Sequence, residues 1–82
     1  MKTTVYALKV CPYCDSAKRL LSQRGIPFEV VMMDDWSDEQ WDAQEKKNGL
    51  KTAPQIYSGD RLIGGFSDLE ALDKKDQLKS LK

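Results

Sequence analysis

Histidine is absent from this sequence of 82 residues, which removes the usual general base of hydrolases and the commonest metal ligand. An excess of basic charge is also lacking, because 13 lysines and arginines balance 13 aspartates and glutamates. This balance argues against a nucleic-acid binder with a large basic surface. No apolar run approaches the roughly 20 residues of a membrane helix. Cysteine occurs only twice, and we expect any chemistry to belong to that pair.

The N-terminal residues Met1–Thr4 lack the apolar stretch of a secretory signal peptide. We therefore expect one domain over residues 1–82, a cytoplasmic monomer without membrane or nucleic-acid partners. Structural disulfides are rare in the cytoplasm, and Cys11 and Cys14 enclose a loop too short to stabilise a fold by much. Two cysteines without histidine are also too few for a zinc site within one chain, so we expect no bound metal.

Charge is unevenly distributed along the chain although the total is zero. Residues 1–33 carry five basic and two acidic side chains, whereas residues 34–45 carry six acidic side chains and no basic one. Both cysteines lie in the positive segment. A local positive field of this kind attracts anionic ligands to the cysteines.

The first third of the sequence alternates strand and helix signals. β-Branched and aromatic residues over 3–8 predict a strand. Pro12 suits the first turn of a helix, apolar residues recur after it at helical spacing, and Gly25 suits the end of that helix. The apolar run over 27–33 then predicts a buried strand.

A capping-box pattern, Ser37 followed by Gln40, predicts a second helix that ends near Asn48-Gly49. In this helix Trp36 and Trp41 take the two positions of a hydrophobic staple, in which an apolar residue before the helix packs on one in its first turns. The staple gives both tryptophans a structural role.

The last third predicts a hairpin over 55–63 with a tight turn at Gly59-Asp60. Ser67 and Glu70 form another capping box that opens the last helix, and leucines at 78 and 81 predict a further turn. The order is thus β-α-β-α-β-β-α. A strand–helix–strand start implies a parallel pair, and the hairpin adds antiparallel strands. We predict an α/β fold, a four-stranded mixed sheet flanked by helices on both faces.

The sequence Cys11-Pro12-Tyr13-Cys14 stands where the first strand meets the first helix, a position typical of thiol redox chemistry. Thiol–disulfide exchange requires a thiolate. Unpaired N–H groups and the dipole at the helix start should lower the pKa of Cys11, with Lys9 acting in the same direction. Cys14, one turn further on, should be more buried and act as the resolving thiol. This exchange requires no general base.

These four residues resemble the active site of dithiol glutaredoxins, which have the thioredoxin fold. Thr52-Ala53-Pro54 is similar to the family's Thr-Val-Pro, and the sequence GGFSDL at 64–69 is similar to its Gly-Gly-Cys-Ser/Asp-Asp-Leu. The resemblance implies a glutathione-dependent enzyme that reduces protein disulfides and glutathione mixed disulfides. It also implies glutathione as reducing co-substrate, no permanently bound cofactor, and ribonucleotide reductase as a candidate client.

The resemblance further implies roles for single residues. It implies a cis Ala53-Pro54 bond, which leaves the backbone of Ala53 free to pair with an extended peptide. The helix start after Gly65 suits the γ-glutamyl carboxylate of glutathione, and Asp68 suits its ammonium group. The implied glutathione-binding set is Lys9, Tyr13, Thr52, Ala53, Gly65, Phe66, Ser67 and Asp68, and the residues implied to shape the active site are Pro12, Tyr13 and Pro54.

The sequence departs from the family pattern where the glycyl carboxylate of glutathione would bind. Many members have lysine at the position of Leu8, whereas here the lysine is Lys9, one step along, where a strand turns its side chain the other way. Trp41 stands where many members have arginine or glutamine. Lys51 is a candidate to bind the glycyl carboxylate in place of the residues missing at these two positions.

Two other functions stay open. One is a redoxin reduced by thioredoxin reductase that serves ribonucleotide reductase, although its typical motif, Trp-Ser-Gly-Phe-Arg-Pro-Asp, agrees with this sequence only at Gly65-Phe66. The other is a dimeric carrier of a [2Fe–2S] cluster held by Cys11 and two glutathiones. In the family, a proline at the position of Pro12 tends to disfavour cluster binding.

Overall fold

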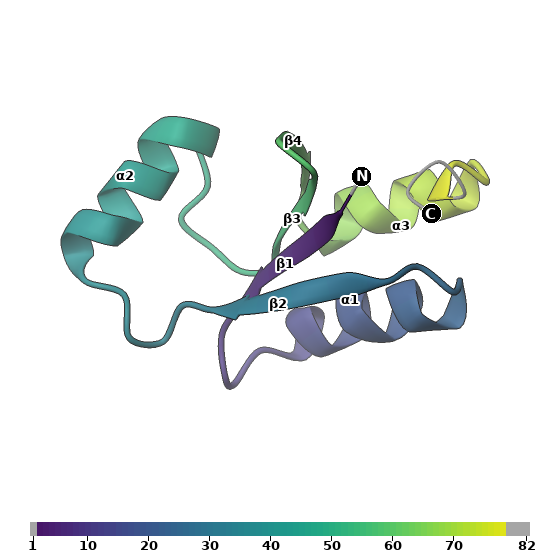
Figure 1. Ribbon diagram of the computed structural model, residues 1–82, viewed down its shortest axis with the longest axis horizontal. Helices are drawn as coiled ribbons and strands as arrows, with labels where there is room; N and C mark the ends of the chain where they lie inside the picture. Colours follow the sequence, from purple (N-terminus) through teal and green to yellow (C-terminus); the bar gives the residue numbers. More distant parts are fainter. Residues whose placement is uncertain (1, 79–82) are drawn as a thin grey trace.

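The computed structural model describes residues 2–78, and its helices and strands follow the predicted order. They are β1 (Thr3–Ala7), α1 (Pro12–Gln23), β2 (Phe28–Met32), α2 (Asp38–Asn48), β3 (Gln55–Ser58), β4 (Arg61–Gly64) and α3 (Phe66–Lys74). The strands form one mixed sheet in the order β2-β1-β3-β4, in which β1 runs parallel to β2 and antiparallel to β3 (Figure 1). Among residues 2–78, no helix combines the length and the apolar composition of a membrane span.

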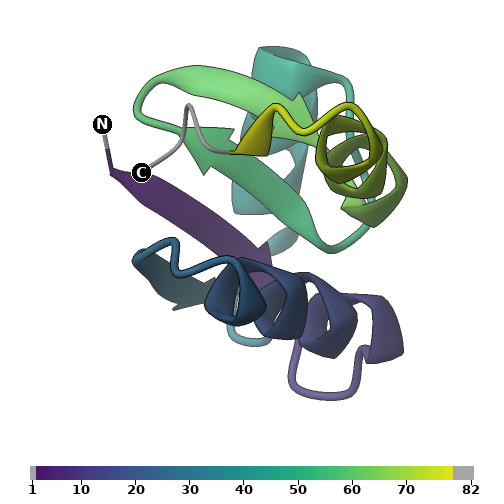
Figure 2. The same ribbon diagram turned by 90° about the vertical axis from the view of Figure 1, so that its right-hand side faces the viewer.

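Helices cover both faces of the sheet, as predicted. Figure 2 shows α1 and α3 together on one face, with α2 behind the other. The core lies between the sheet and the α1–α3 layer, and its buried side chains include Val5, Ala7, Cys14, Ala17, Leu21, Ile56 and Leu69. This packing places the start of α1 beside the end of the central strand β1, which is where both cysteines lie.

The local signals for helix ends are confirmed in α1 and α2. The Ser37 hydroxyl accepts a hydrogen bond from the Gln40 amide at 3.2 Å, and the Gln40 side chain accepts one from the Ser37 amide at 2.9 Å. Gly25, directly after the cap of α1, has a φ of 70°, a backbone conformation that favours glycine. The predicted staple also forms, with ring centroids of Trp36 and Trp41 5.7 Å apart.

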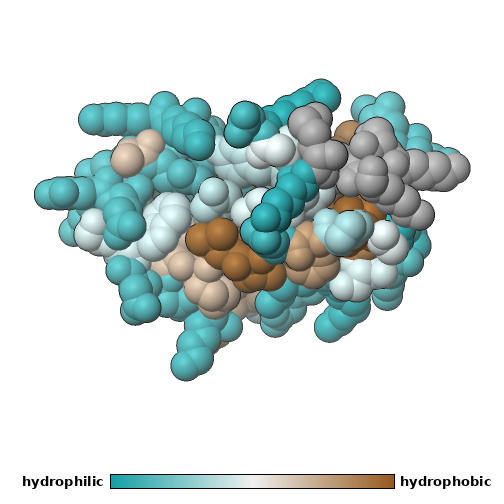
Figure 3. All heavy atoms as spheres, in the orientation of Figure 1, coloured by the Kyte–Doolittle hydropathy of each residue, from teal (hydrophilic) through white to brown (hydrophobic). Residues whose placement is uncertain are grey.

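The strand predicted over 27–33 forms as β2, but the prediction that it is buried is wrong, because β2 lies at the edge of the sheet. The Val30 side chain is 41% exposed and that of Met32 is 46% exposed. Figure 3 shows brown and tan side chains gathered along this strand. This exposure follows from the strand order. The hairpin strand β3 pairs with the other side of β1, so β2 pairs with β1 alone and forms the edge of the sheet.

The start of the last helix also differs from its prediction. Helix α3 begins at Phe66 with Gly65 as its N-cap, so Ser67 lies inside the first turn and is not the cap. The Asp68 carboxylate, three residues after this N-cap, accepts a hydrogen bond from the Gly65 amide at 3.0 Å and satisfies that donor. Beyond α3, Leu78 is buried in the core, and Leu81 lies outside the described residues.

Candidate active site

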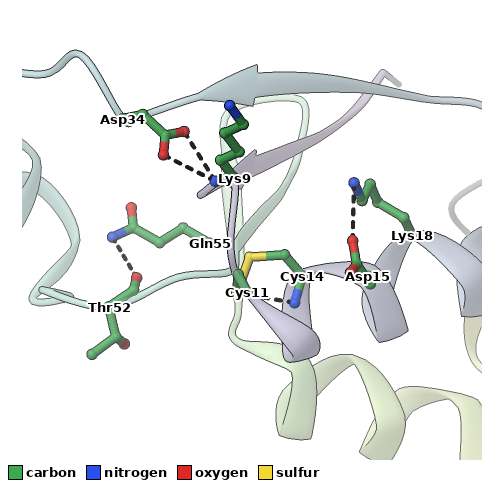
Figure 4. The surroundings of a disulfide bond; sticks show 8 residues. All are labelled: Lys9, Cys11, Cys14, Asp15, Lys18, Asp34, Thr52 and Gln55. Atoms are coloured by element: carbon green, nitrogen blue, oxygen red, sulfur yellow. Dashed lines mark hydrogen bonds and ion pairs between the residues drawn. A yellow bond between two sulfur atoms is a disulfide. The ribbon is translucent and has the colours of Figure 1, made fainter.

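The two cysteines stand at the start of α1 and are joined by a disulfide (Figure 4). Cys11 is the N-cap and is half-buried, whereas Cys14 in the first turn is fully buried. The Cys14 amide donates a hydrogen bond to the Cys11 sulfur at 3.2 Å. A backbone donor therefore points at the sulfur predicted to attack, and the more accessible of the two sulfurs is that same atom.

The loop before Cys11 is held by a contact that the sequence did not indicate. Both carboxylate oxygens of Asp34 accept hydrogen bonds from the Lys9 amide, at 3.1 and 3.0 Å. The Lys9 side chain is exposed and points away from the disulfide (Figure 4). The geometry therefore gives no support to the expectation that the Lys9 charge acts on Cys11, and this loop is positioned by its backbone instead.

A groove of about 330 Å³ opens next to the cysteine pair. It brings together residues from all three motifs, namely Tyr13, Thr52, Ala53, Pro54, Gly65, Phe66 and Ser67. The rings of Tyr13 and Phe66 come from the first and the third motif, and their centroids lie 6.1 Å apart. Residues far apart in the sequence, from Tyr13 to Ser67, thus form one surface beside the redox pair.

The segment Thr52–Pro54 forms one wall of this groove and contains a cis Ala53-Pro54 bond. Within the part of the chain that the structure describes, the Ala53 amide has no hydrogen-bond partner. That donor is available to a ligand. Two residues of the implied glutathione set lie outside the groove lining: Lys9 points away, and the Asp68 carboxylate binds the Gly65 amide at the groove's edge.

Sequence reasoning missed Gln55, the first residue of β3. Its side chain is fully buried, donates hydrogen bonds to the carbonyls of Leu50 and Thr52, and accepts them from Gln44 and Asn48. The available signal was a long polar side chain at the start of a strand that is otherwise apolar and buried. Taken by itself, that pattern is equally typical of an exposed strand end.

Comparison with known proteins agrees with this geometry. The glutaredoxin family model matches residues 3–63. Glutaredoxin 3 of Escherichia coli K12 is 38% identical over 77 residues, covering 94% of this chain and 92% of that protein. The glutaredoxin of Pseudomonas aeruginosa is 35% identical over 77 residues, with coverage of 94% and 90%.

Solved structures show the same fold. A buckwheat glutaredoxin–glutathione complex superimposes with a TM-score of 0.88 at 25% identity, covering 96% of this chain and 74% of that one. A dithiolic glutaredoxin of Trypanosoma brucei brucei gives a TM-score of 0.85 at 34% identity, with coverage of 96% and 84%. The predicted thioredoxin-like fold is thereby confirmed. With its redox pair at the start of α1 and relatives of this similarity along nearly its whole length, the chain belongs to the glutaredoxin family of thiol–disulfide oxidoreductases.

Proposed function

We propose that this chain reduces protein disulfides and glutathione mixed disulfides with glutathione as the electron donor. The observation that carries the proposal is the groove beside the cysteine pair, where Tyr13 of α1 lines one cavity with the Thr52–Pro54 segment and the start of α3. Its volume of about 330 Å³ falls at the lower end of the range for small-molecule sites.

The reaction begins with attack of the Cys11 thiolate on one sulfur of the substrate disulfide. A mixed disulfide forms at Cys11 and the other substrate sulfur leaves as a thiolate. For a protein substrate, Cys14 gives up its proton and attacks the Cys11 sulfur, which releases the reduced protein and leaves the Cys11–Cys14 disulfide. One glutathione thiolate then reopens that disulfide, and a second releases oxidised glutathione and restores both thiols.

The groove offers glutathione two kinds of contact. The amides at the start of α3, beside Gly65 and Ser67, suit the γ-glutamyl carboxylate, because a helix start attracts anions. The free Ala53 amide suits the peptide backbone of the ligand. Asp68 remains the predicted partner of the ligand's ammonium group, and Lys9 stays a prediction without support from its orientation.

We further propose that the protein acts in the cytoplasm, as a monomer, with ribonucleotide reductase among its candidate clients. The cytoplasm keeps glutathione reduced, and this chemistry requires a reduced pool to restore the Cys11–Cys14 pair.

Turnover of a glutathione mixed disulfide, with glutathione and glutathione reductase regenerating the enzyme, tests the proposal. Cys11→Ser should abolish turnover. Cys14→Ser should keep reduction of the mixed disulfide and lose reduction of protein disulfides, because only the second reaction uses the resolving thiol. Strong activity in Cys11→Ser would overturn the assigned roles, and activity supported by thioredoxin reductase but not by glutathione would overturn the choice of reductant.

A further inference from the structure

The wall of the groove at Thr52–Pro54 belongs to no helix or strand. A segment of this kind lacks the repeated backbone hydrogen bonds that hold a helix or a sheet, so other contacts must fix its position. The Thr52 carbonyl accepts a hydrogen bond at 3.0 Å from the Gln55 side chain (Figure 4). This bond joins the wall to a group that is fully buried behind it.

We propose that Gln55 is a positioning residue that holds the groove wall in place by tying it to helix α2. The inference rests on the proposed function, since it assigns a role in binding at that same groove. Gln55 lies outside the groove lining and is 0% exposed, so it acts through Thr52 and Ala53 and not by touching a ligand.

The side-chain amide of Gln55 uses all of its hydrogen-bonding capacity, and this fixes its orientation. Its nitrogen donates to two backbone carbonyls, those of Thr52 at 3.0 Å and Leu50 at 3.4 Å. Its oxygen accepts from two side-chain amides on α2, Gln44 at 3.0 Å and Asn48 at 2.9 Å. Turning the amide over would place oxygen against two carbonyls, so one arrangement is strongly favoured.

The helix side of this tie is itself anchored. Asn48 donates a second hydrogen bond to the Tyr57 hydroxyl at 3.0 Å and accepts one from the Leu50 amide at 2.8 Å. The end of α2, the loop that follows it and the start of β3 therefore share one polar network. Because Gln55 is the member of this network that reaches Thr52, its loss should free the wall while leaving α2 attached through Asn48.

The test compares Gln55→Met with a matched control, Tyr57→Phe. Methionine keeps the length of the side chain and removes all four hydrogen bonds. Phenylalanine removes one hydrogen bond of the same network and leaves the contact with Thr52 intact. Three quantities are measured in each protein: KM and kcat for a glutathione mixed disulfide, the NMR order parameter of the Ala53 amide, and the rate at which iodoacetamide alkylates Cys11.

We expect Gln55→Met to raise KM by about three- to tenfold, the range that one positioning hydrogen bond is worth, and to lower the order parameter of the Ala53 amide. The kcat and the alkylation rate of Cys11 should stay at the wild-type values, because the cysteine pair lies on α1. Tyr57→Phe should match the wild type in KM and in the order parameter. If Gln55→Met does not fold, Gln55→Asn, which is too short to span from α2 to Thr52, takes its place.

A Gln55 variant that folds with a wild-type KM and a wild-type order parameter at Ala53 would overturn the proposal, and so would an equal change in Tyr57→Phe. A uniform loss of alkylation rate and kcat would also overturn it, since that pattern indicates general damage to the fold. If the wild-type protein does not turn over the glutathione mixed disulfide, the proposed function fails. The order parameter of the Ala53 amide then decides the role of Gln55 without reference to activity.

Discussion

Replacing Asp68 by asparagine should separate two roles of one carboxylate. In the structure this group accepts a hydrogen bond from the Gly65 amide at 3.0 Å, and α3 begins immediately after that residue. In the proposed function the same carboxylate accepts the ammonium group of glutathione. Asparagine retains an oxygen that can accept from Gly65 but carries no charge, whereas alanine loses both features.

The expected size of each effect follows from these contacts. Asp68→Asn removes only the favourable interaction of a negative charge with the helix start, about 0.3–1 kcal/mol of unfolding free energy. Asp68→Ala also removes the hydrogen bond to the Gly65 amide, which brings the loss to about 1–2 kcal/mol. Loss of an exposed charge-assisted hydrogen bond to the ligand should raise KM for a glutathione mixed disulfide about tenfold in both variants.

Urea unfolding and steady-state turnover measure the two effects on the same protein preparations. The decisive comparison is the asparagine variant, in which stability changes little and KM changes much. If its KM stays within about twofold of the wild type while Asp68→Ala loses stability as expected, Asp68 only stabilises the start of α3 and the ammonium contact must lie elsewhere.

Two further predictions concern charged pairs. Lys51, the candidate partner of the glycyl carboxylate, forms an ion pair with Glu45 at 3.2 Å between Nζ and Oε2. Lys51→Gln should raise KM for a glutathione mixed disulfide about two- to fivefold at low salt, whereas Glu45→Gln should lower it and the control Lys74→Gln should leave it unchanged. Equal KM values in all three variants would refute the assignment. The bidentate hydrogen bonds from Arg24 lower the pKa of Asp73 below its ordinary value of 3.8. The wild-type protein should therefore be thermally more stable than Arg24→Gln above pH 3.8, and this difference should disappear as the pH falls through the lowered pKa. A stability difference between these two proteins that does not depend on pH would contradict the second prediction.

Local signals in the sequence were sufficient for the helices and the hairpin, because caps and tight turns depend on residues a few positions apart. Ser37 with Gln40 is such a signal, and the structure contains the bonds it predicts. The start of α3 shows the limit, since Ser67 suits an N-cap by its residue type, whereas in the structure Gly65 is the N-cap and Asp68 bonds its amide. The exposure of Val30 at the sheet edge depends on strand order, which no local pattern contains.

The candidate site divides in the same way. The Cys11–Cys14 pair, the Thr52–Pro54 segment and the residues after Gly65 are each recognisable as motifs, and the fold brings their side chains to one groove. The residues that hold those motifs in place were not recognisable. Asp34, which binds the Lys9 amide, and Gln55, which binds the Thr52 carbonyl, act over distances in sequence or through burial that their identities do not indicate.

Helix α2 shows why such supporting contacts matter for the groove. None of its side chains is fully buried, so it lacks the apolar face that attaches α1 and α3 to the core. It is attached instead by hydrogen bonds to Gln55 and Tyr57 and by the contact of Trp41 with Trp36, whose ring lies 5.9 Å from that of Tyr6. Each such hydrogen bond contributes only about 0.5–1.5 kcal/mol, less than burial of a large apolar side chain. The redox pair therefore stands on the strongly packed layer of the fold, while the opposite wall of the groove is anchored to the weakly packed one. It follows that substitutions that break the hydrogen bonds of Gln55 should alter ligand affinity before they alter the chemistry of Cys11.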